Sequence, residues 1–380
     1  MTQRRTDNSL FYSIVVLMFF GVVMIFSASS ALVMPKLEMT HFLKMQLLWI
    51  LIGLPVLLFF KRLDFLQLNK AKWAFGAIGL VVMLQVLAIV LDGRNHRWIR
   101  IGPIGIQPSE LAKPALILFL AFFVTWKEKI INSGRYGIAP ALMVLGLLFV
   151  SIGWGDLGTS IVLAITAGVV FLVAGLQWRA VGIAFSLLLV ASIAFVCQPG
   201  KNYRVGRLVG WIDPDYTILD VIDPNDYVKK YVREASVAGD FSYQARQAKI
   251  AVGSGGVFGV GLMQSAQKLE FLPEAQTDCI YAIVGEELGL WGTTGVLFGF
   301  LTILWRGIRL AFVSRDQFGR FLALGITVCI IVQAFVNMTM VLGLIPTKGI
   351  PLPLISYGGS SLLSSLICLG MLLSVSEQSA

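Results

Sequence analysis

The chain is a series of apolar runs separated by short polar connections. A helix needs about 20 apolar residues to cross the hydrocarbon core of a bilayer, and most runs are close to that length. The pattern predicts ten membrane-spanning helices, at residues 11–33, 42–60, 72–91, 109–126, 138–153, 158–176, 180–197, 279–305, 320–343 and 356–375. The expected fold class is therefore an all-α polytopic membrane protein, with residues 1–380 in a single integral membrane domain.

The long polar interval of the chain lies between the seventh and eighth runs and covers residues 198–278. Within it we expect a short helix at 242–252, followed by a glycine-rich turn at 253–261. Glycines in such a turn allow positive φ angles. The turn lacks the Gly-Lys-Ser/Thr that ends a nucleotide-binding P-loop, so it is not interpreted as one.

Composition and charge support the membrane interpretation and orient the chain. The sequence is 57% hydrophobic and 13% charged, whereas a soluble domain has about 25% charged residues. The net charge of +9 does not indicate nucleic acid as a partner, because the basic residues lie mostly in short connections between apolar runs. Alternate connections and the N-terminal end carry 14 of the 30 basic residues, and the other side carries few apart from residues 92–113 and the long loop. This alternation predicts that both termini are cytoplasmic and that the loop 198–278 is extracytoplasmic.

Three acids lie at or inside the start of the eighth run: Asp278, Glu286 and Glu287. An acid at membrane depth is costly, so it usually faces protein or water and serves a function. For Asp278 the competing hypothesis is a helix N-cap. For Glu286 and Glu287 we favour a hydrogen bond or ion pair with a buried partner.

The predicted topology brings the N-terminal ends of runs 4, 6, 8 and 10 to the outer face. Each end carries an unusual polar stretch, at residues 107–114, 155–160, 277–278 and 356–361. Helix N-termini bind phosphate through free N–H groups and a partial positive charge. A basic loop with Arg94, Arg97 and Arg100 lies on the same side, so we expect a phosphate-bearing, membrane-embedded ligand there.

Each of these stretches also has a purely structural interpretation. Ser109 could cap its helix, and Glu110 and Lys113, three residues apart, could simply neutralise each other. Asp156 could be the N-cap of run 6. Gly358 and Gly359 could only allow close packing of helices.

Taken together, the motifs resemble those of the SEDS family (shape, elongation, division and sporulation). The resemblance covers nearly the whole chain and rests on Arg97-Trp98-Ile99, Gln107-Pro108-Ser109-Glu110, Asp156-Leu157-Gly158-Thr159, Gly253-Ser254-Gly255-Gly256, Leu272-Pro273-Glu274 with Thr277-Asp278, and Pro351-Leu352-Pro353-Leu354-Ile355-Ser356-Tyr357-Gly358-Gly359. The run Thr347-Lys348-Gly349 is similar to the division branch rather than the elongation branch. Gln276 departs from the family pattern, which has His there.

The resemblance implies a peptidoglycan glycosyltransferase that polymerises lipid II, an undecaprenyl-pyrophosphate-linked disaccharide, by inverting glycosyl transfer. It implies a bacterial cytoplasmic (inner) membrane location with the active site on the extracytoplasmic face. A class B penicillin-binding protein (a transpeptidase) and other divisome proteins are the implied partners. The alternatives left open are a lipid II flippase, the elongation polymerase of the same family, a proton-coupled transporter with Asp278 and Glu286 as relay, and a scaffold for the transpeptidase.

The resemblance also implies roles for individual residues. Asp278 is the expected catalytic general base. The expected substrate-binding residues are Glu110, Lys113, Arg97, Trp98, Arg207, Thr277, Ser356, Gly358 and Gly359. Whether a divalent cation such as Mg²⁺ or Mn²⁺ takes part stays open, with Glu110 and Asp278 as its candidate ligands, and no other cofactor is implied.

Overall fold

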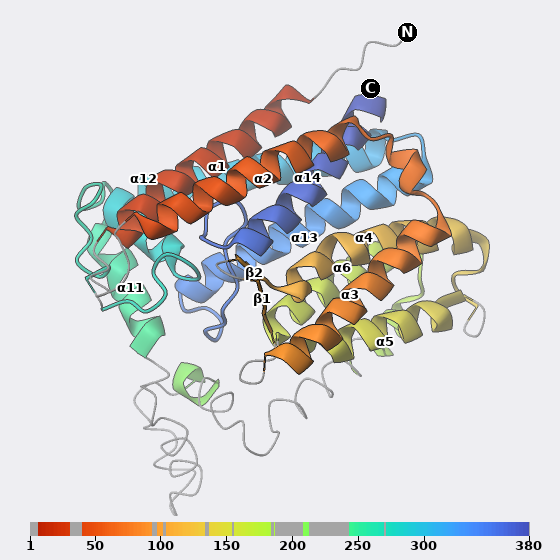
Figure 1. Ribbon diagram of the computed structural model, residues 1–380, viewed down its shortest axis with the longest axis horizontal. Coiled ribbons are helices and arrows are strands. Elements are labelled where there is room, and N and C mark those ends of the chain that lie inside the picture. Colours follow the sequence, from red (N-terminus) through yellow and green to blue (C-terminus); the bar gives the residue numbers. More distant parts are fainter. Residues whose placement is uncertain are drawn as a thin grey trace, which may run out of the picture.

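The computed structural model describes residues 7–30, 40–92, 97–101, 104–133, 137–153, 156–183, 186, 208–212, 243–269 and 271–379 (Figure 1). Most of these residues are helical. The main helices are α1 (Asn8–Ser29), α2 (His41–Arg62), α3 (Ala71–Leu91), α4 (Pro108–Lys127), α5 (Ala139–Gly153), α6 (Leu157–Val173), α11 (Tyr243–Gly255), α12 (Ile280–Val313), α13 (Gln317–Val341) and α14 (Gly359–Ser379). Two short 3₁₀ helices, η1 (Phe65–Leu68) and η2 (Glu128–Ile130), follow α2 and α4.

The helices confirm the polytopic membrane architecture that the apolar runs predict. Within the described residues, seven helices are long and apolar enough to cross a membrane, and the shorter α5 and α6 coincide with two further predicted runs. The predicted run at 180–197 lies almost entirely outside the described residues. The count of ten spans therefore stays a prediction.

Three helices form the centre of the bundle, and others lie at its rim. Buried residues make up 89% of the apolar window of α14 and 72% of those of α4 and α13, against 22% for α2. α14 packs on α2, α4 and α13, and α13 also packs on α12 and α6. The polar residues on α4, α13 and α14 are therefore held in the least lipid-exposed part of the molecule.

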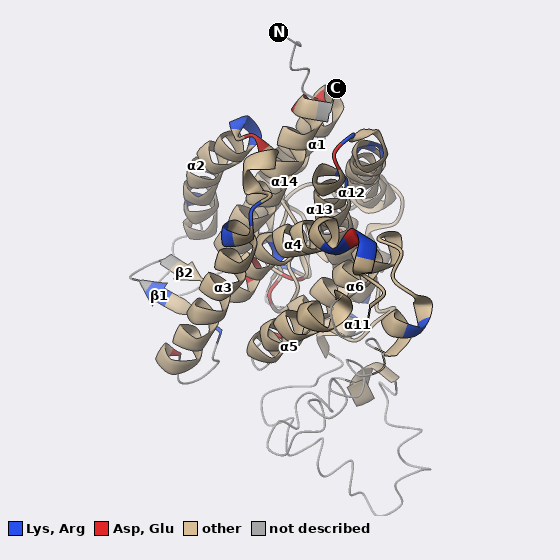
Figure 2. Cartoon of the chain, turned by 90° about the vertical axis from the view of Figure 1, so that its right-hand side faces the viewer, with Lys and Arg blue, Asp and Glu red and all other residues tan. Residues whose placement is uncertain are grey.

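The start of α1 and the end of α14 lie at the same end of the bundle (Figure 1). The Asp7 carboxylate accepts from Arg306 Nε at 2.6 Å, and Ser376 Oγ accepts from the Asp7 amide at 3.1 Å. Lys61 pairs with Glu377 at 3.3 Å. The start of α1 therefore meets the ends of α2, α12 and α14, as the predicted alternation requires. Figure 2, viewed from the right-hand side of Figure 1, shows Lys and Arg at the ends of several helices.

Two elements lie toward the opposite end (Figure 1). One is an antiparallel hairpin of β1 (Ile99–Ile101) and β2 (Ile104–Ile106), in which Arg100 pairs with Gly105. The expectation of a purely helical chain misses this hairpin, which lies in the basic connection before α4. The other element is α11, which confirms the short helix expected at 242–252.

The eighth predicted run is not one straight helix. α12 is interrupted at Gly289, whose φ of 63° and ψ of −152° favour glycine. Tyr281 Oη donates to the Thr293 carbonyl at 3.3 Å, although twelve residues of continuous helix would span about 18 Å. The short arm of α12 (residues 280–288) therefore folds back along its long arm (residues 290–313). The break was invisible in the sequence because the apolar run continues across it.

Candidate active site

The N-terminal ends of α4 and α6 meet around the buried carboxylate of Asp156. Gln107 Nε2 and Ser109 Oγ each donate to its Oδ2 at 2.9 Å, and Thr159 Oγ1 does so at 2.7 Å. The Thr159 amide donates to Oδ1 at 3.2 Å, which confirms Asp156 as the N-cap of α6. Ser109 is not the cap of α4, because Gln107 holds that position and Pro108 begins the helix.

Arg97 connects the β-hairpin to this network. Its Nη2 lies 3.4 Å from Asp156 Oδ1, and its backbone amide donates to Asp92. Burial alone would raise the pKa of Asp156, but Arg97 and the hydrogen bonds from Thr159 and Ser109 outweigh burial and lower the pKa from 3.8. The carboxylate is therefore charged at neutral pH. Arg97, expected to bind substrate, has a protein partner as well.

A second junction forms where the segment before α12 meets the connection between α13 and α14. Three successive carbonyls, of Gln276, Thr277 and Asp278, each accept a hydrogen bond from that side. The donors are the Tyr357 amide at 3.0 Å, Ser356 Oγ at 2.5 Å and Asn337 Nδ2 at 2.8 Å. These bonds fix the backbone around Asp278 firmly.

The position of Asp278 argues against the helix-cap hypothesis. The residue preceding α12 is Cys279, and no side chain caps the helix. The Asp278 carboxylate instead lies against Gly349, where an added Cβ would sit 2.7 Å from Oδ2. Two nearby non-glycine residues, Glu274 (φ 55°) and Leu354 (φ 66°), adopt left-handed backbone conformations. Such strain is found preferentially at functional sites.

The two junctions are linked through the connection between α13 and α14. A Cβ on Gly158, in the first turn of α6, would lie 2.7 Å from Ile350 and 3.2 Å from Lys348. On the other side, the same connection reaches Asp278 through Gly349. The predicted convergence of the N-terminal ends of α4, α6, α12 and α14 is therefore confirmed.

Glu110 and Lys113 form a buried ion pair in the first two turns of α4. Lys113 Nζ lies 2.6 Å from Glu110 Oε2, and the residues are 3% and 2% exposed, respectively. Ser364 of α14 donates to the Glu110 carbonyl at 2.7 Å. Ser364 of α14 thus contacts this pair, and Ser356, just before α14, contacts the backbone segment of Asp278. The ion pair that their spacing allows is therefore present, and the role of the two residues in substrate binding stays a prediction.

The remaining expected substrate residues have different surroundings. A Cβ on Gly359 would clash with Trp49, so this glycine permits close packing of α14 on α2. A Cβ on Gly358 would meet Ser361 only at 3.6 Å, so packing does not require that glycine. Trp98 is half-buried and covers Gly105 of the hairpin. Thr277 Oγ1 donates to Glu274 Oε2 at 2.9 Å, and Arg207 lies outside the described residues.

Glu286 and Glu287, at the far end of the short arm, have the structural partners that the sequence predicts. Glu286 accepts from Ser265 Oγ at 2.5 Å and from the Ala266 amide at 2.9 Å. Glu287 accepts from Ser27 Oγ at 2.6 Å and pairs with Lys268 at 2.9 Å. Both acids hold the chain that follows α11 against the short arm and α1.

Sequence reasoning missed two residues next to Asp278. Gly349 counted only as a mark of one branch of the family, and Asn337 had no assigned role. The apolar pattern gives no signal for Gly349, which is 71 positions from Asp278 in the chain. A signal for Asn337 did exist, because an amide in the middle of an apolar helix needs a specific hydrogen-bond partner.

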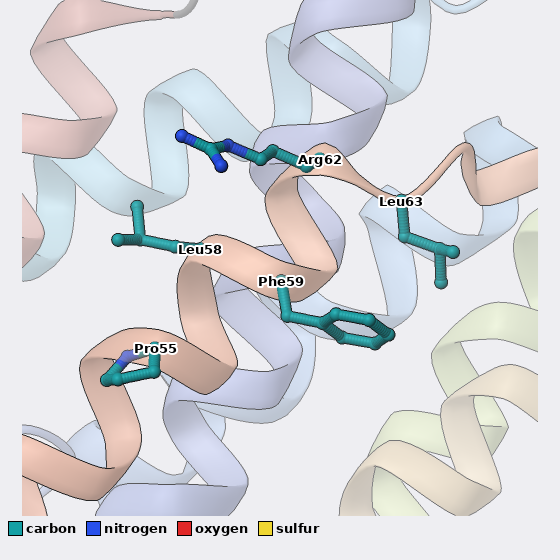
Figure 3. Close-up of a pocket in the computed structure, with 5 residues that line it drawn as sticks. All are labelled: Pro55, Leu58, Phe59, Arg62 and Leu63. Carbon is teal, nitrogen blue, oxygen red and sulfur yellow. The ribbon is translucent and has the colours of Figure 1, made fainter.

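Two further features lie outside this site. A hollow of about 430 Å³ near the C-terminal end of α2 is lined by Pro55, Leu58, Phe59, Arg62 and Leu63 (Figure 3). It lies at the end of the bundle where Lys61 pairs with Glu377, opposite Asp278. Among the residues that the structure describes, no three His, Cys, Asp or Glu side chains cluster to form a metal site.

Comparisons with known proteins agree with this architecture. Residues 7–380 match the family of cell cycle proteins that comprises FtsW, RodA and SpoVE. The chain is 35% identical to the probable peptidoglycan glycosyltransferase FtsW of Geobacter metallireducens, over 98% of this chain and 95% of that one. It is 36% identical to the stage V sporulation protein E of Bacillus subtilis, over the full length of both.

Solved structures share the fold. A chain of a peptidoglycan synthase complex that coordinates polymerization and crosslinking aligns with a TM-score of 0.72 at 25% identity, covering 99% of this chain and 98% of that one. The rod shape determining protein RodA of Thermus thermophilus aligns with a TM-score of 0.67 at 24% identity, covering 98% and 97%. The resemblance seen in the motifs is confirmed: the chain belongs to the FtsW/RodA/SpoVE (SEDS) family, on its FtsW-like side.

Proposed function

We propose that Asp278 is the general base of the peptidoglycan glycosyltransferase reaction that this chain catalyses in cell division. The observation that carries the assignment is the junction around Asp278. The Asp278 carbonyl is held by Asn337 of α13, the two preceding carbonyls are held by the connection between α13 and α14, and the Asp278 carboxylate faces Gly349 without capping a helix. A positioned base of this kind contributes about 10²–10⁴-fold to the rate.

The reaction joins two sugars that lipid II delivers. The 4-hydroxyl of the acceptor sugar loses its proton to the Asp278 carboxylate as its oxygen attacks the anomeric carbon of the growing chain. The bond from that carbon to the polyprenyl pyrophosphate breaks, and the electron pair leaves with the pyrophosphate. Attack opposite the leaving group inverts the anomeric configuration. Because pyrophosphate leaves as an anion, no second acid is needed.

Basic residues stabilise the charge on the departing pyrophosphate. Arg97 reaches this region from the β-hairpin, and Lys113 from the first turns of α4; the sequence adds Arg207. Arg97 already pairs with the Asp156 carboxylate, and Lys113 pairs with the Glu110 carboxylate. These pairs hold the cations in place before substrate arrives, which avoids reorganisation during the reaction.

The described residues do not favour a resident cation between Glu110 and Asp278. The Glu110 carboxylate is already neutralised by Lys113 at 2.6 Å, and that ammonium group would repel a cation beside it. Hard divalent cations also need several oxygen ligands. The mechanism therefore relies on the chain's own cations.

We place the active site on the extracytoplasmic face of the bacterial inner membrane. The positive charge near the chain ends supports this orientation, because cytoplasmic connections carry an excess of Lys and Arg. The related synthase complex that polymerizes and crosslinks supports a class B penicillin-binding protein as the transpeptidase partner. Other divisome proteins are expected to join that assembly.

Polymerisation of purified lipid II tests the assignment of Asp278. Asp278→Asn should lower glycan synthesis by about 10²–10⁴-fold while leaving folding and membrane insertion intact, with and without the transpeptidase. Retained synthesis by the variant would show that Asp278 is not the base. If the native chain moved lipid II across vesicles but made no glycan, and Asp278→Asn still moved it, the flippase alternative would replace the polymerase.

The buried pair on α4 has its own test. Glu110→Gln removes the charge that neutralises Lys113 but keeps the shape of the side chain. We expect a strong loss of polymerisation in correctly folded protein, because Lys113 would no longer be held in place. A near-native rate would return Glu110 and Lys113 to a purely structural role.

A further inference from the structure

Asn337 lies on α13, at the place where the two loops of the catalytic site meet. Its side chain is fully buried, and its Nδ2 group donates at 2.8 Å to the Asp278 carbonyl and at 2.8 Å to the Ile350 carbonyl. One amide group thus joins the segment that carries Asp278 to the segment that carries Gly349. Each of its two hydrogens serves one loop.

The side-chain oxygen of this amide indicates that Asn337 does more than fill space in the core. Its Oδ1 is buried without a hydrogen-bond partner. An unsatisfied buried polar atom costs about 1–3 kcal/mol, so an apolar side chain would be cheaper for packing alone. The amide therefore has a use for its two donors that outweighs this cost.

A neighbour on the same helix separates two possible uses. Gln333 lies one turn earlier on α13, is also buried, and donates from Nε2 to the Pro351 carbonyl at 2.7 Å. Gln333 therefore anchors the connection between α13 and α14 but makes no bond to the Asp278 segment. Of these two side chains, only Asn337 donates hydrogen bonds to both the Asp278 segment and the connection between α13 and α14.

We infer that Asn337 is a positioning residue that sets the place of the Asp278 carboxylate relative to Gly349 and the reacting hydroxyl. It touches no reacting atom and acts only through the backbone of residue 278. Misplacing a catalytic group by about 1 Å can cost about 10²-fold in rate. The inference rests on the proposed role of Asp278 as base.

The test compares Asn337→Ala with Gln333→Leu in lipid II polymerisation by the full-length protein. Each variant removes one buried amide from α13, and rates are counted per folded molecule. Asn337→Ala should lower kcat by about 10²-fold with KM within about twofold, whereas Gln333→Leu, which leaves the Asp278 segment bonded to α13, should lower kcat by less than about tenfold. If Asn337→Ala does not fold, Asn337→Ser, which keeps one donor, replaces it with a smaller expected loss of kcat.

Equal losses of kcat in the two variants, or a loss confined to KM, would overturn the inference. The double variant Asp278→Asn/Asn337→Ala separates this outcome from a failure of the proposed function. If Asn337 acts through Asp278, the double variant should be no slower than Asp278→Asn alone. If Asp278→Asn is fully active, the assignment of Asp278 as base fails. If the double variant is slower than Asp278→Asn alone, only the role of Asn337 is overturned.

Discussion

Acids in opposite situations lie just before the start of the short arm of α12 and near its end. At residues 286–287, both carboxylates are fully buried and bonded to hydroxyls, amides or an ammonium group that fix the chain after α11. At residue 278, the side chain is half-buried, and Asn337 of α13 donates to the backbone carbonyl. The first arrangement uses acids to hold the fold. The second uses the fold to hold an acid.

The difference separates structural from chemical roles within one apolar run. A buried carboxylate whose bonding partners are protein groups is not placed to exchange protons with a substrate. The transporter alternative required Asp278 and Glu286 to act as a relay. Glu286 is instead bonded to Ser265 and Ala266, and the helix between it and Asp278 is lined by buried apolar residues.

The largest effect is expected at the structural end of the arm. Lys268→Met removes the ammonium group from Glu287 and leaves a buried charge unpaired, which costs about 3–5 kcal/mol. Thermal unfolding in detergent should show the loss, and Glu287→Gln/Lys268→Met should recover part of it. Unchanged stability of Lys268→Met would contradict the structural role of Glu287.

A smaller effect, on rate rather than stability, is expected at the chemical end. Gly349→Ala would place a Cβ 2.7 Å from Asp278 Oδ2, so the carboxylate or the loop must move. We expect polymerisation to fall by about 10²-fold with little change in unfolding temperature. Gly146→Ala on α5, where an added Cβ meets nothing within 4 Å, is the matched control and should be near native.

The smallest effect concerns Asp156, which holds α4, α6 and the hairpin together. Asp156→Asn should cost about 1–3 kcal/mol, because hydrogen bonds to a charged group become bonds to a neutral one. The folded-state pKa lies below 3.8, so this stabilisation is present above that pH and is lost as the pH falls through the folded-state pKa. Unfolding curves should therefore differ by a constant amount from pH 5 to 8 and converge only in stronger acid. A difference that already shrinks between pH 7 and 5 would contradict the lowered pKa.

The sequence predicted the parts of this fold that depend on local pattern. Apolar runs located the helices, and Asp156 was identified as a possible N-cap from its position. Charge alternation explained why the start of α1 and the end of α14 share one end of the bundle. The break at Gly289 could not be predicted, because apolar residues continue on both sides of it. The bond from Asn337 to the Asp278 carbonyl joins residues 59 positions apart, and only tertiary packing determines such a contact.

One measurement tests the central claim that the two ends of the arm have different tasks. Lipid II polymerisation is measured for the native chain, Asp278→Asn and Lys268→Met, and each rate is divided by the fraction of folded protein. Asp278→Asn should be fully folded and inactive, whereas Lys268→Met should be poorly folded but close to native in rate per folded molecule. Activity in folded Asp278→Asn would contradict the catalytic role of Asp278. Inactivity in folded Lys268→Met would contradict a purely structural role of Glu286 and Glu287.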